Sequence, residues 1–424
     1  DPACRRRARG RGRRGRRPAG RLVSAALEPQ GEHDVPDGEE GAGAGPGLID
    51  WRVAERVARW VIARRPPDVT YDPSELSRSF AGATARAEEL ICQITGWRAP
   101  TPARSVVTDR EGWARANVAS FQRLLAPALV KFERKKEERK ATRRRRTDAV
   151  SLPSWLLELP EPLAGKVAGA SRSVSGAQLG AVLGWMSTRV LGQYDLLLTE
   201  EMSEDQDLLY YVGPNIVELE QRHGFAPDQF RLWLALHEVT HRCQFTAVPW
   251  LRGYFLGLVD EAIQPFQSDP RRLAEMVRRT ADQVRSGQSP FDDAGVLGIV
   301  ASEPQMAAIR KLQALMSLLE GHGDVTMDRA GASEVPGARK FSQTLHERRQ
   351  SVKGPAKVLQ QVLGLEAKLR QYQQGEAFIY AVEARGGDEL FSRVWQGPEW
   401  LPTLAEVRDP DTWIDRVGGE QGGK

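Results

Sequence analysis

The sequence predicts a mainly α-helical protein of the α+β class: a helical bundle with one small β-sheet beside a helix that carries the pattern HExxH. Three observations lead to this prediction. Apolar residues recur at helical spacing over most of the chain that follows an N-terminal tail. Two short apolar runs, within residues 194–200 and 207–215, have acids or Gly-Pro at their edges, as strands do. The HExxH pattern lies in an apolar segment, residues 232–245, whose length suits a helix.

The composition excludes several classes of protein. The 424 residues are 41% hydrophobic and 27% charged, which is typical of a soluble globular chain. No apolar run approaches the ~18 residues of a transmembrane helix, and the stretch RLVSAALEP is too short for a secretory signal. Cys4, Cys92 and Cys243 are odd in number and widely spaced, so no disulfide framework is expected. We therefore expect a cytoplasmic protein that does not bind membranes.

Composition also divides the chain. Residues 1–47 are rich in Arg, Gly, Pro and acids without apolar periodicity, which predicts a disordered tail. We expect residues 48–424 to form a single domain. Within it, residues 48–150 are a helical N-terminal part and residues 151–424 hold the functional site.

The net charge of +4 is mild but unevenly distributed. Basic residues concentrate in RRRARGRGRRGRR of the tail and in a segment at residues 131–146. A nucleic-acid-binding surface is one interpretation. Neither run interleaves aromatic residues for base stacking, which favours a solvated tail and a solvated helix instead. Nucleic acid is therefore not the partner we expect.

The N-terminal part contains three predicted helices. The first, LIDWRVAERVARWVIARR, ends before Pro66 and Pro67. The second spans residues 73–96, with Ser74 as its N-cap. The third begins near residue 112 and runs into the basic segment, after which TRRRRTDAVSLPSW reads as an exposed connection.

In the second part, AQLGAVLGWMSTRVLG predicts a compact apolar helix with small residues on one side, and IVELEQRHGF a short helix. Pro227 suits the first turn of the HExxH helix, Asp228 suits its dipole, and the helix ends before Pro249. A further helix runs from an N-cap at Ser302 to Gly331.

His237, Glu238 and His241 are the candidate centre of function. Positions i and i+4 of a helix share a face, about 40° apart, so His237 and His241 can direct two imidazoles at one ion. A zinc ion lowers the pKa of a bound water towards about 7, and Glu238 can act as its general base in attack on a carbonyl. This is the arrangement of zinc metallopeptidases.

The alternative is two surface histidines on an amphipathic helix, with Glu238 contacting a histidine. The apolar flank FRLWLAL and the uncharged Val239 and Thr240 favour the metal site. Arg242 departs from the stricter form of the pattern, which prefers an uncharged residue at that position.

A catalytic zinc needs a third protein ligand and leaves one position open. Among several carboxylates and histidines, Glu320 is favoured, because it ends a Leu/Met stripe where a buried acid needs a partner. Gly321 and Gly323 would let helices approach closely. His322 projects about 200° from Glu320 on a regular helix, so it is an alternative ligand only if a glycine breaks that helix. The remaining candidates are Asp260, Glu261, Asp324, His33, His223 and His346.

Longer blocks carry a family resemblance. The chain resembles the zincin-like metallopeptidase family common in actinobacteria, and the resemblance covers roughly residues 48–417. The blocks that carry it are LGAVLGWMSTRVLGQYD, VGPNIVELE, FRLWLALHEVTHRCQFTAVPWLR, MSLLEGHGDVTMD, LGLEAKLRQYQQGEAFI and WLPTLAEVRDPDTWIDRV. EGHGDVTMD and GLEAKLRQYQQGE resemble its branch associated with biosynthesis of the deazaflavin coenzyme. The resemblance implies a zincin-like fold and a Zn²⁺ cofactor. Glu320 and Asp324 match the ExxxD of gluzincins, which implies Glu320 as ligand and Asp324 as the group that orients a ligating histidine.

Hydrolysis also needs a group that stabilises the oxyanion. Tyr372, Arg370 and His346 are candidates for oxyanion or substrate contacts, although an ordinary helix-surface position or interhelical contact is the favoured interpretation of each.

The sequence thus predicts a zinc-dependent hydrolase, a metallopeptidase acting on a peptide or small amide. One alternative is a non-catalytic zinc-binding accessory protein of deazaflavin coenzyme biosynthesis. Another is a basic nucleic-acid-binding protein, whose binding would be salt-sensitive. The sequence sets neither the substrate nor the oligomeric state.

Overall fold

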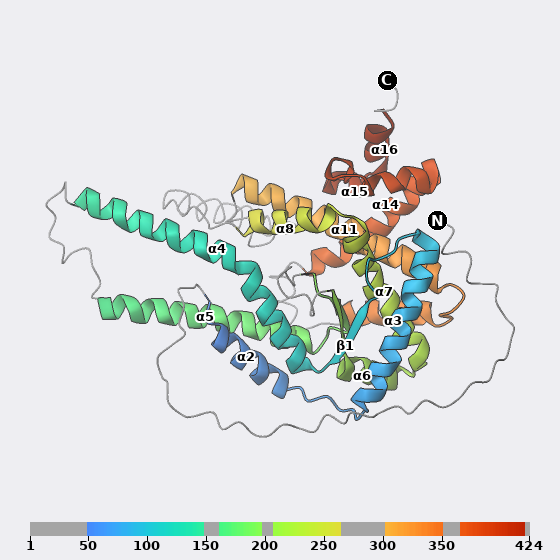
Figure 1. Cartoon of the computed structure of the whole chain (residues 1–424), viewed down its shortest axis with the longest axis horizontal. Helices are drawn as coiled ribbons and strands as arrows, with labels where there is room; N and C mark the ends of the chain where they lie inside the picture. The colour runs from blue at the N-terminus through green and yellow to red at the C-terminus, as the bar shows by residue number, and fades with distance from the viewer. Residues whose placement is uncertain (1–48, 148–160, 197–206, 264–301, 351–364, 420–424) are drawn as a thin grey trace, which may run out of the picture.

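The computed structural model describes residues 49–147, 161–196, 207–263, 302–350 and 365–419 (Figure 1). This part of the chain is mainly helical with one three-stranded sheet, which confirms the predicted fold class. The predicted tail lies outside the described residues, and the single-domain division stays a prediction. None of the described helices combines the length and hydropathy of a bilayer-spanning segment.

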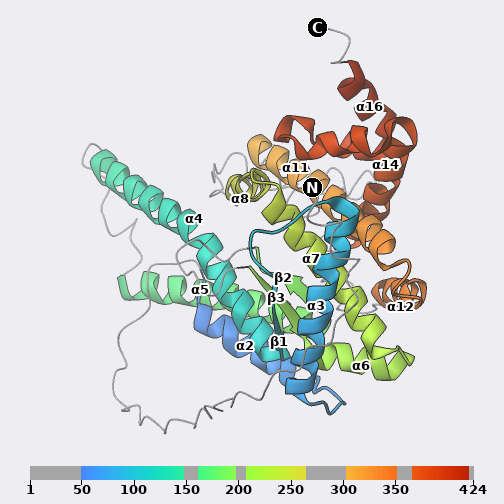
Figure 2. The same ribbon diagram turned by 45° about the vertical axis from the view of Figure 1, so that its right-hand side comes forward.

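The N-terminal part contains α2 (Trp51–Ala63), α3 (Pro73–Thr95), β1 (Arg104–Thr108) and α4 (Arg110–Thr147). Asp72, rather than Ser74, caps α3: its carboxylate accepts the backbone N–H of Ser74 at 2.8 Å, and Pro73 takes the first helical position. The helix α4 continues through the residues predicted as the start of an exposed connection. Its far half projects from the rest of the fold (Figures 1 and 2).

The remaining elements follow in chain order. They are α5 (Glu161–Ser187), β2 (Gly192–Tyr194), β3 (Leu208–Val212), α6 (Gly213–His223), α7 (Pro227–Ala247), α8 (Leu251–Ala262), α11 (Glu303–Gly331), α12 (Ala338–Gln350) and α14 (Leu365–Phe391). Two 3-10 turns, η2 (Ser392–Trp395) and η3 (Pro398–Trp400), lead to α15 (Leu404–Arg408) and α16 (Pro410–Gly419). The predicted helices after residue 175 are all present, with α11 bounded as expected.

The sheet has the order β1-β3-β2, with β1 parallel and β2 antiparallel to the central strand β3. It lies between α3 and α7 on one side and α2, α4 and α5 on the other (Figure 2). Successive side chains of β3 point to opposite faces of the sheet and so enter different apolar clusters. Leu209 and Tyr211 belong to the apolar cluster with α3 and α7, whereas Val212 belongs to the cluster with α2, α4 and α5. The prediction missed β1. Of the strand predicted within residues 194–200, residues 197–200 lie outside the described residues, and β2 ends at Tyr194.

The helices α2 and α5 pack backbone against backbone through the small residues that the sequence placed on one side of α5. Gly176, Gly180 and Gly184 repeat every fourth residue and face α2. A Cβ on Gly180 would lie 2.1 Å from the carbonyl oxygen of Ala54, and one on Gly184 would lie 2.7 Å from that of Ala58. Side chains larger than hydrogen therefore do not fit at this contact.

A third apolar cluster joins α8, α11, α14, α15 and α16, and it includes Leu318, Phe378 and Trp413. Because α11 contacts both this cluster and α7, it connects the C-terminal helices to the centre of the fold. This position brings the residues around Glu320 beside those around His237.

Candidate metal centre

The helix α7 is anchored by its apolar face. Trp233, Leu236, Val239 and Cys243 are buried in the cluster that α7 shares with α3 and the sheet. Their helical spacing leaves the opposite face to carry His237 and His241, one turn apart. Burial of one face therefore fixes where the two imidazoles point.

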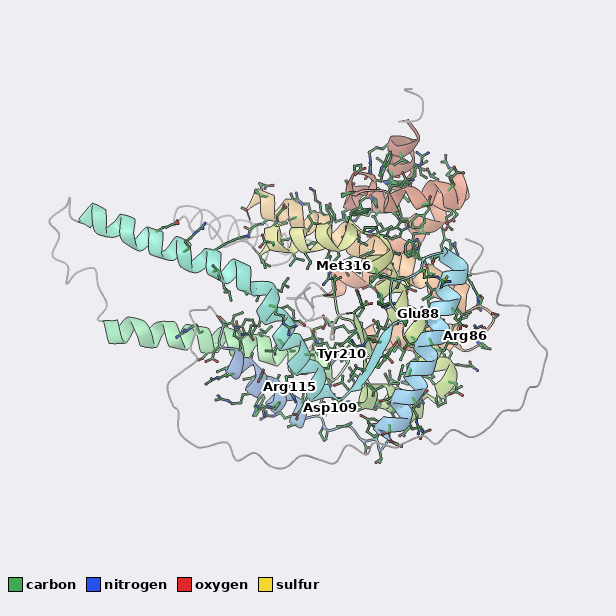
Figure 3. The ribbon with its side chains drawn as sticks, in the orientation of Figure 1. Arg86, Glu88, Asp109, Arg115, Tyr210 and Met316 are labelled. Atoms are coloured by element: carbon green, nitrogen blue, oxygen red, sulfur yellow. The ribbon has the colours of Figure 1, made fainter. Side chains whose placement is uncertain are left out.

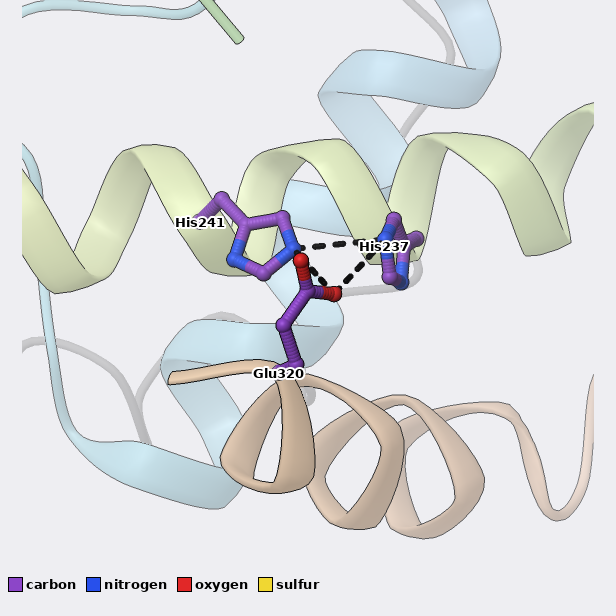
Figure 4. Close-up of side chains that lie close together, drawn as sticks. All are labelled: His237, His241 and Glu320. Atoms are coloured by element: carbon purple, nitrogen blue, oxygen red, sulfur yellow. Dashed lines mark hydrogen bonds and ion pairs between the residues drawn. The ribbon is translucent and has the colours of Figure 1, made fainter. Parts of the chain in front are cut away.

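Two helices converge on one small volume. The Nε2 atoms of His237 and His241 are 3.2 Å apart, and Glu320 reaches them from α11 (Figure 4). Its Oε2 lies 3.6 Å from Nε2 of His241 and 3.9 Å from Nε2 of His237. Within the described residues, this is the group of histidine, cysteine and acidic side chains placed to hold a metal ion.

These separations fit a metal ion. Ligand atoms at tetrahedral positions around zinc, with bonds of about 2.0–2.1 Å, lie about 3.3–3.4 Å from one another. Two ring nitrogens and a carboxylate oxygen are a donor set that zinc accepts. Two imidazoles directed at each other also need a proton or a cation between them, because both nitrogen lone pairs are otherwise repulsive.

The close approach of α11 depends on glycines, as the sequence predicted. A Cβ on Gly321 would lie 2.3 Å from the backbone carbon of Gly375, so α14 packs directly behind α11. A Cβ on Gly323 would lie 3.3 Å from Cε1 of His241, so the same helix also meets the imidazole closely. Glu320 is thereby held within reach of the α7 histidines.

Glu238 lies at the edge of the same site. Its side chain rests against β2, where it accepts a backbone hydrogen bond from Tyr194 and contacts Gly192. Burial, together with the negative charge of Glu320, raises the pKa of Glu238 to about 7, while His241 and the Tyr194 N–H oppose the rise. A carboxyl group with this pKa can both accept and release a proton near neutral pH.

Burial alone would lower the pKa of His241. The hydrogen bond and negative charge of Glu320 outweigh burial, and the pKa of His241 rises to about 9 in the metal-free site. The imidazole is thus held among anionic and polar groups suited to a cation.

His322 lies outside the three-residue group. The helix α11 continues unbroken through Gly321 and Gly323, so the condition under which His322 could have become a ligand is not met. Its imidazole packs among the rings of Trp97, Phe391 and Trp395. Burial lowers the pKa of His322 to about 3, so this ring is neutral.

The other candidates are distributed as follows. Asp324 is half-buried on α11, one turn after Glu320, and its orienting role stays a prediction. Asp260 pairs with Lys131 at 2.9 Å. The side chains of His346, Arg370 and Tyr372 lie outside the described part of the structure, so their proposed substrate contacts stay predictions.

The charged residue that departs from the stricter motif has a structural explanation. Arg242 is fully buried and donates at 2.7 Å to Asp207, just before β3, and at 2.7 Å to Glu88 of α3. It also donates to the carbonyl of Thr101, ahead of β1. Glu88, one of the two carboxylates that accept from Arg242, is labelled on α3 in Figure 3. Arg242 therefore joins α7 to α3 and to the sheet on the side away from the imidazoles.

Sequence reasoning missed two contributions to the site. The Oε1 atom of Gln244 lies 3.0 Å from Nδ1 of His241 and accepts its hydrogen bond, and the spacing of three residues on one helix could have indicated this contact. Gly192 and Tyr194 reach Glu238 through tertiary packing, and no local pattern marks them.

Comparisons with known proteins agree with this geometry. Residues 49–414 match the family described as zincin-like metallopeptidase. The crystal structure of a proposed hydrolase from Chloroflexus aurantiacus, described as having a novel fold, is similar with a TM-score of 0.58 and 29% sequence identity. The similarity covers 88% of this chain and 99% of that one. No curated protein matches the chain.

Proposed function

Since the chain belongs to the zincin-like metallopeptidase family, we propose that it is a zinc-dependent hydrolase that cleaves a peptide or small amide. The observation that carries this proposal is the convergence of His237, His241 and Glu320, with Glu238 beside them. These three residues would hold the zinc, and Asp324 would orient a ligating histidine.

When bound, zinc polarises the substrate carbonyl and lowers the pKa of water. The protein supplies the proton transfers. Glu238 accepts a proton from the attacking water and returns it to the leaving amine. The hydrogen bond from Tyr194 and the contact with Gly192 hold the Glu238 carboxylate in one orientation during both transfers.

The second candidate is a zinc-binding accessory protein without turnover, within the branch associated with deazaflavin coenzyme biosynthesis that the sequence blocks resemble. Within the part of the chain that the structure describes, the group offers three protein ligands, which supports catalysis over this role, because purely structural zinc sites are usually closed by a fourth. The carboxylate of Glu238 beside the group also supports catalysis, since a structural site needs no base.

The test compares Glu238→Gln with His237→Ala. Glu238→Gln should retain zinc, measured by metal analysis of the purified protein, and lose about 10²–10⁴-fold in the rate of peptide-library cleavage. His237→Ala should lose both zinc and cleavage. The exposed Glu303→Gln on α11 is the matched control and should match the wild type. Zinc-loaded wild type and Glu238→Gln with equal rates would reject the proposed mechanism.

A further inference from the structure

Gln244 connects the two helices that carry the candidate ligands. It lies on α7, three residues after His241, and its side chain is fully buried. Its amide contacts three groups: Nδ1 of His241 at 3.0 Å, the carbonyl oxygen of Leu319 at 2.8 Å, and Nδ1 of His322 at 3.0 Å. The last two belong to α11, the helix of Glu320.

The Leu319 carbonyl determines which way the amide faces. An amide side chain can be turned by 180° with little change in shape, so its orientation follows from its partners. A carbonyl oxygen can only accept a hydrogen bond, so the group facing Leu319 is the NH₂. The Oε1 atom of Gln244 therefore faces His241.

The orientation of Gln244 in turn determines where His241 carries its proton. Because Oε1 only accepts, Nδ1 of His241 must carry a hydrogen and donate it. In the metal-free site the cationic ring carries its second proton on Nε2, which faces His237 and Glu320; when a metal ion replaces that proton, Nε2 is the nitrogen that presents a lone pair there. That is the form in which an imidazole binds a metal.

The second N–H of the amide accounts for His322. It donates to Nδ1 of His322, which must then be unprotonated, so that ring carries its hydrogen on Nε2, 3.4 Å from Oγ1 of Thr326. Aromatic rings surround this imidazole. Its nitrogen completes the hydrogen bonding of a buried amide that would otherwise keep one unsatisfied N–H.

We propose that Gln244 is a positioning residue, which fixes His241 as a metal ligand and ties its orientation to α11 through Leu319 and His322. The inference rests on the proposed function, and it assigns His322 a supporting role. A neutral amide adds no negative charge to the site, unlike the carboxylate that often holds a ligating histidine. The cation would therefore keep more of its charge for the substrate.

The test uses Gln244→Met, which keeps the length of the side chain and removes its hydrogen bonds. We expect its zinc Kd, measured by chelator competition, to rise about 10–100-fold. The matched control is Gln229→Met on the same helix, where the glutamine accepts the N–H of Gly337 at 3.0 Å. The control should keep the wild-type Kd.

A second measurement does not need the metal. In full-length protein with ¹⁵N-labelled histidine, Nδ1–H of His241 should be protected from solvent exchange in both metal-free and zinc-loaded states, and Gln244→Met should lose that protection. An unprotected Nδ1–H in the wild type, or an unchanged zinc Kd in Gln244→Met, would overturn the inference. A protected Nδ1–H in a protein that binds zinc without hydrolysing any substrate would remove the proposed function and leave the assigned hydrogen bond standing.

Discussion

The carboxylate of Glu238 lies directly against the backbone of Gly192. A Cβ on residue 192 would come within 2.5 Å of Oε1 and 2.9 Å of Cδ of Glu238. The carboxylate of Glu238 occupies the position where a Cβ on residue 192 of the edge strand β2 would lie, so only glycine fits there.

Gly192→Ala should displace the Glu238 carboxylate, because the end of a side chain moves more easily than the strand backbone. We expect kcat to fall at least ~10-fold, as expected when a general base is misplaced, while zinc content and the unfolding temperature stay near wild type. Steady-state kinetics and metal analysis measure this. Gly253→Ala on α8, where a Cβ meets nothing within 4 Å, is the control. A fully active Gly192→Ala protein would contradict the role of β2.

Arg242→Met should destabilise the fold by about 3–5 kcal/mol, because it leaves the carboxylates of Glu88 and Asp207 without their buried cation. Denaturant unfolding monitored by circular dichroism measures the change. Arg222→Met removes an exposed pair with Glu218 and should cost no more than about 0.5 kcal/mol. Equal effects of the two substitutions would show that Arg242 is not an anchor of the sheet.

Two glycine substitutions should change stability in opposite directions, one in the contact between α2 and α5 and one at an open position of α3. Gly180→Ala places a Cβ 2.1 Å from a backbone oxygen and should destabilise the protein by about 1–3 kcal/mol. Gly82→Ala, at an exposed position of α3 with nothing within 4 Å, should stabilise it by about 0.5–1 kcal/mol through helix propensity. The unfolding temperatures of both variants measure these changes. A higher unfolding temperature for Gly180→Ala would exclude the backbone-to-backbone packing of α5 on α2.

Glu406 predicts a pH-dependent contribution to stability. Burial raises its pKa, but hydrogen bonds from Arg416 and Thr403 and the charge of Arg416 outweigh burial, so the pKa lies below its usual value. A lowered native pKa means that the stabilisation is complete above the unfolded pKa of about 4.3 and is lost as pH falls through the native value.

Glu406→Gln should therefore cost about 1–2 kcal/mol at pH 7 and progressively less below pH ~4. Unfolding free energies measured across this range give the result. Asp411→Asn, in an exposed pair with Arg385, should change stability by less than about 0.5 kcal/mol at any pH. A cost of Glu406→Gln that is independent of pH would refute the linkage.

Much of the fold could be predicted because it follows local patterns. The bounds of α7 and α11 follow from apolar spacing, from Pro227 and from Ser302, all of which act within one or two turns. The meeting of His237, His241 and Glu320 was also predictable in outline, because the chemistry of these residue types needs a common partner.

What the sequence did not reveal depends on contacts between distant segments. The strand β1 pairs in parallel with β3, roughly a hundred residues later, and its own residues show too short a pattern. The strand β2 begins on Gly192 and Gln193, residue types that do not favour strands, and it is defined by its pairing with β3. The prediction of Ser74 as the N-cap of α3 was wrong, because Asp72 is a better capping residue and is followed by a proline that suits the first helical position.

The contact of α14 with α11 has a consequence for the whole molecule. A Cβ on Gly375 would lie 1.9 Å from the carbonyl oxygen of Ser317, so α14 acts as a backstop that limits how far α11 can retreat from α7. The positions of the three candidate ligands then depend on three stacked helices and not on α7 and α11 alone. A substitution at Gly375, in the last quarter of the sequence, would therefore be expected to shift Glu320 relative to the α7 histidines without touching any of the three candidate ligands.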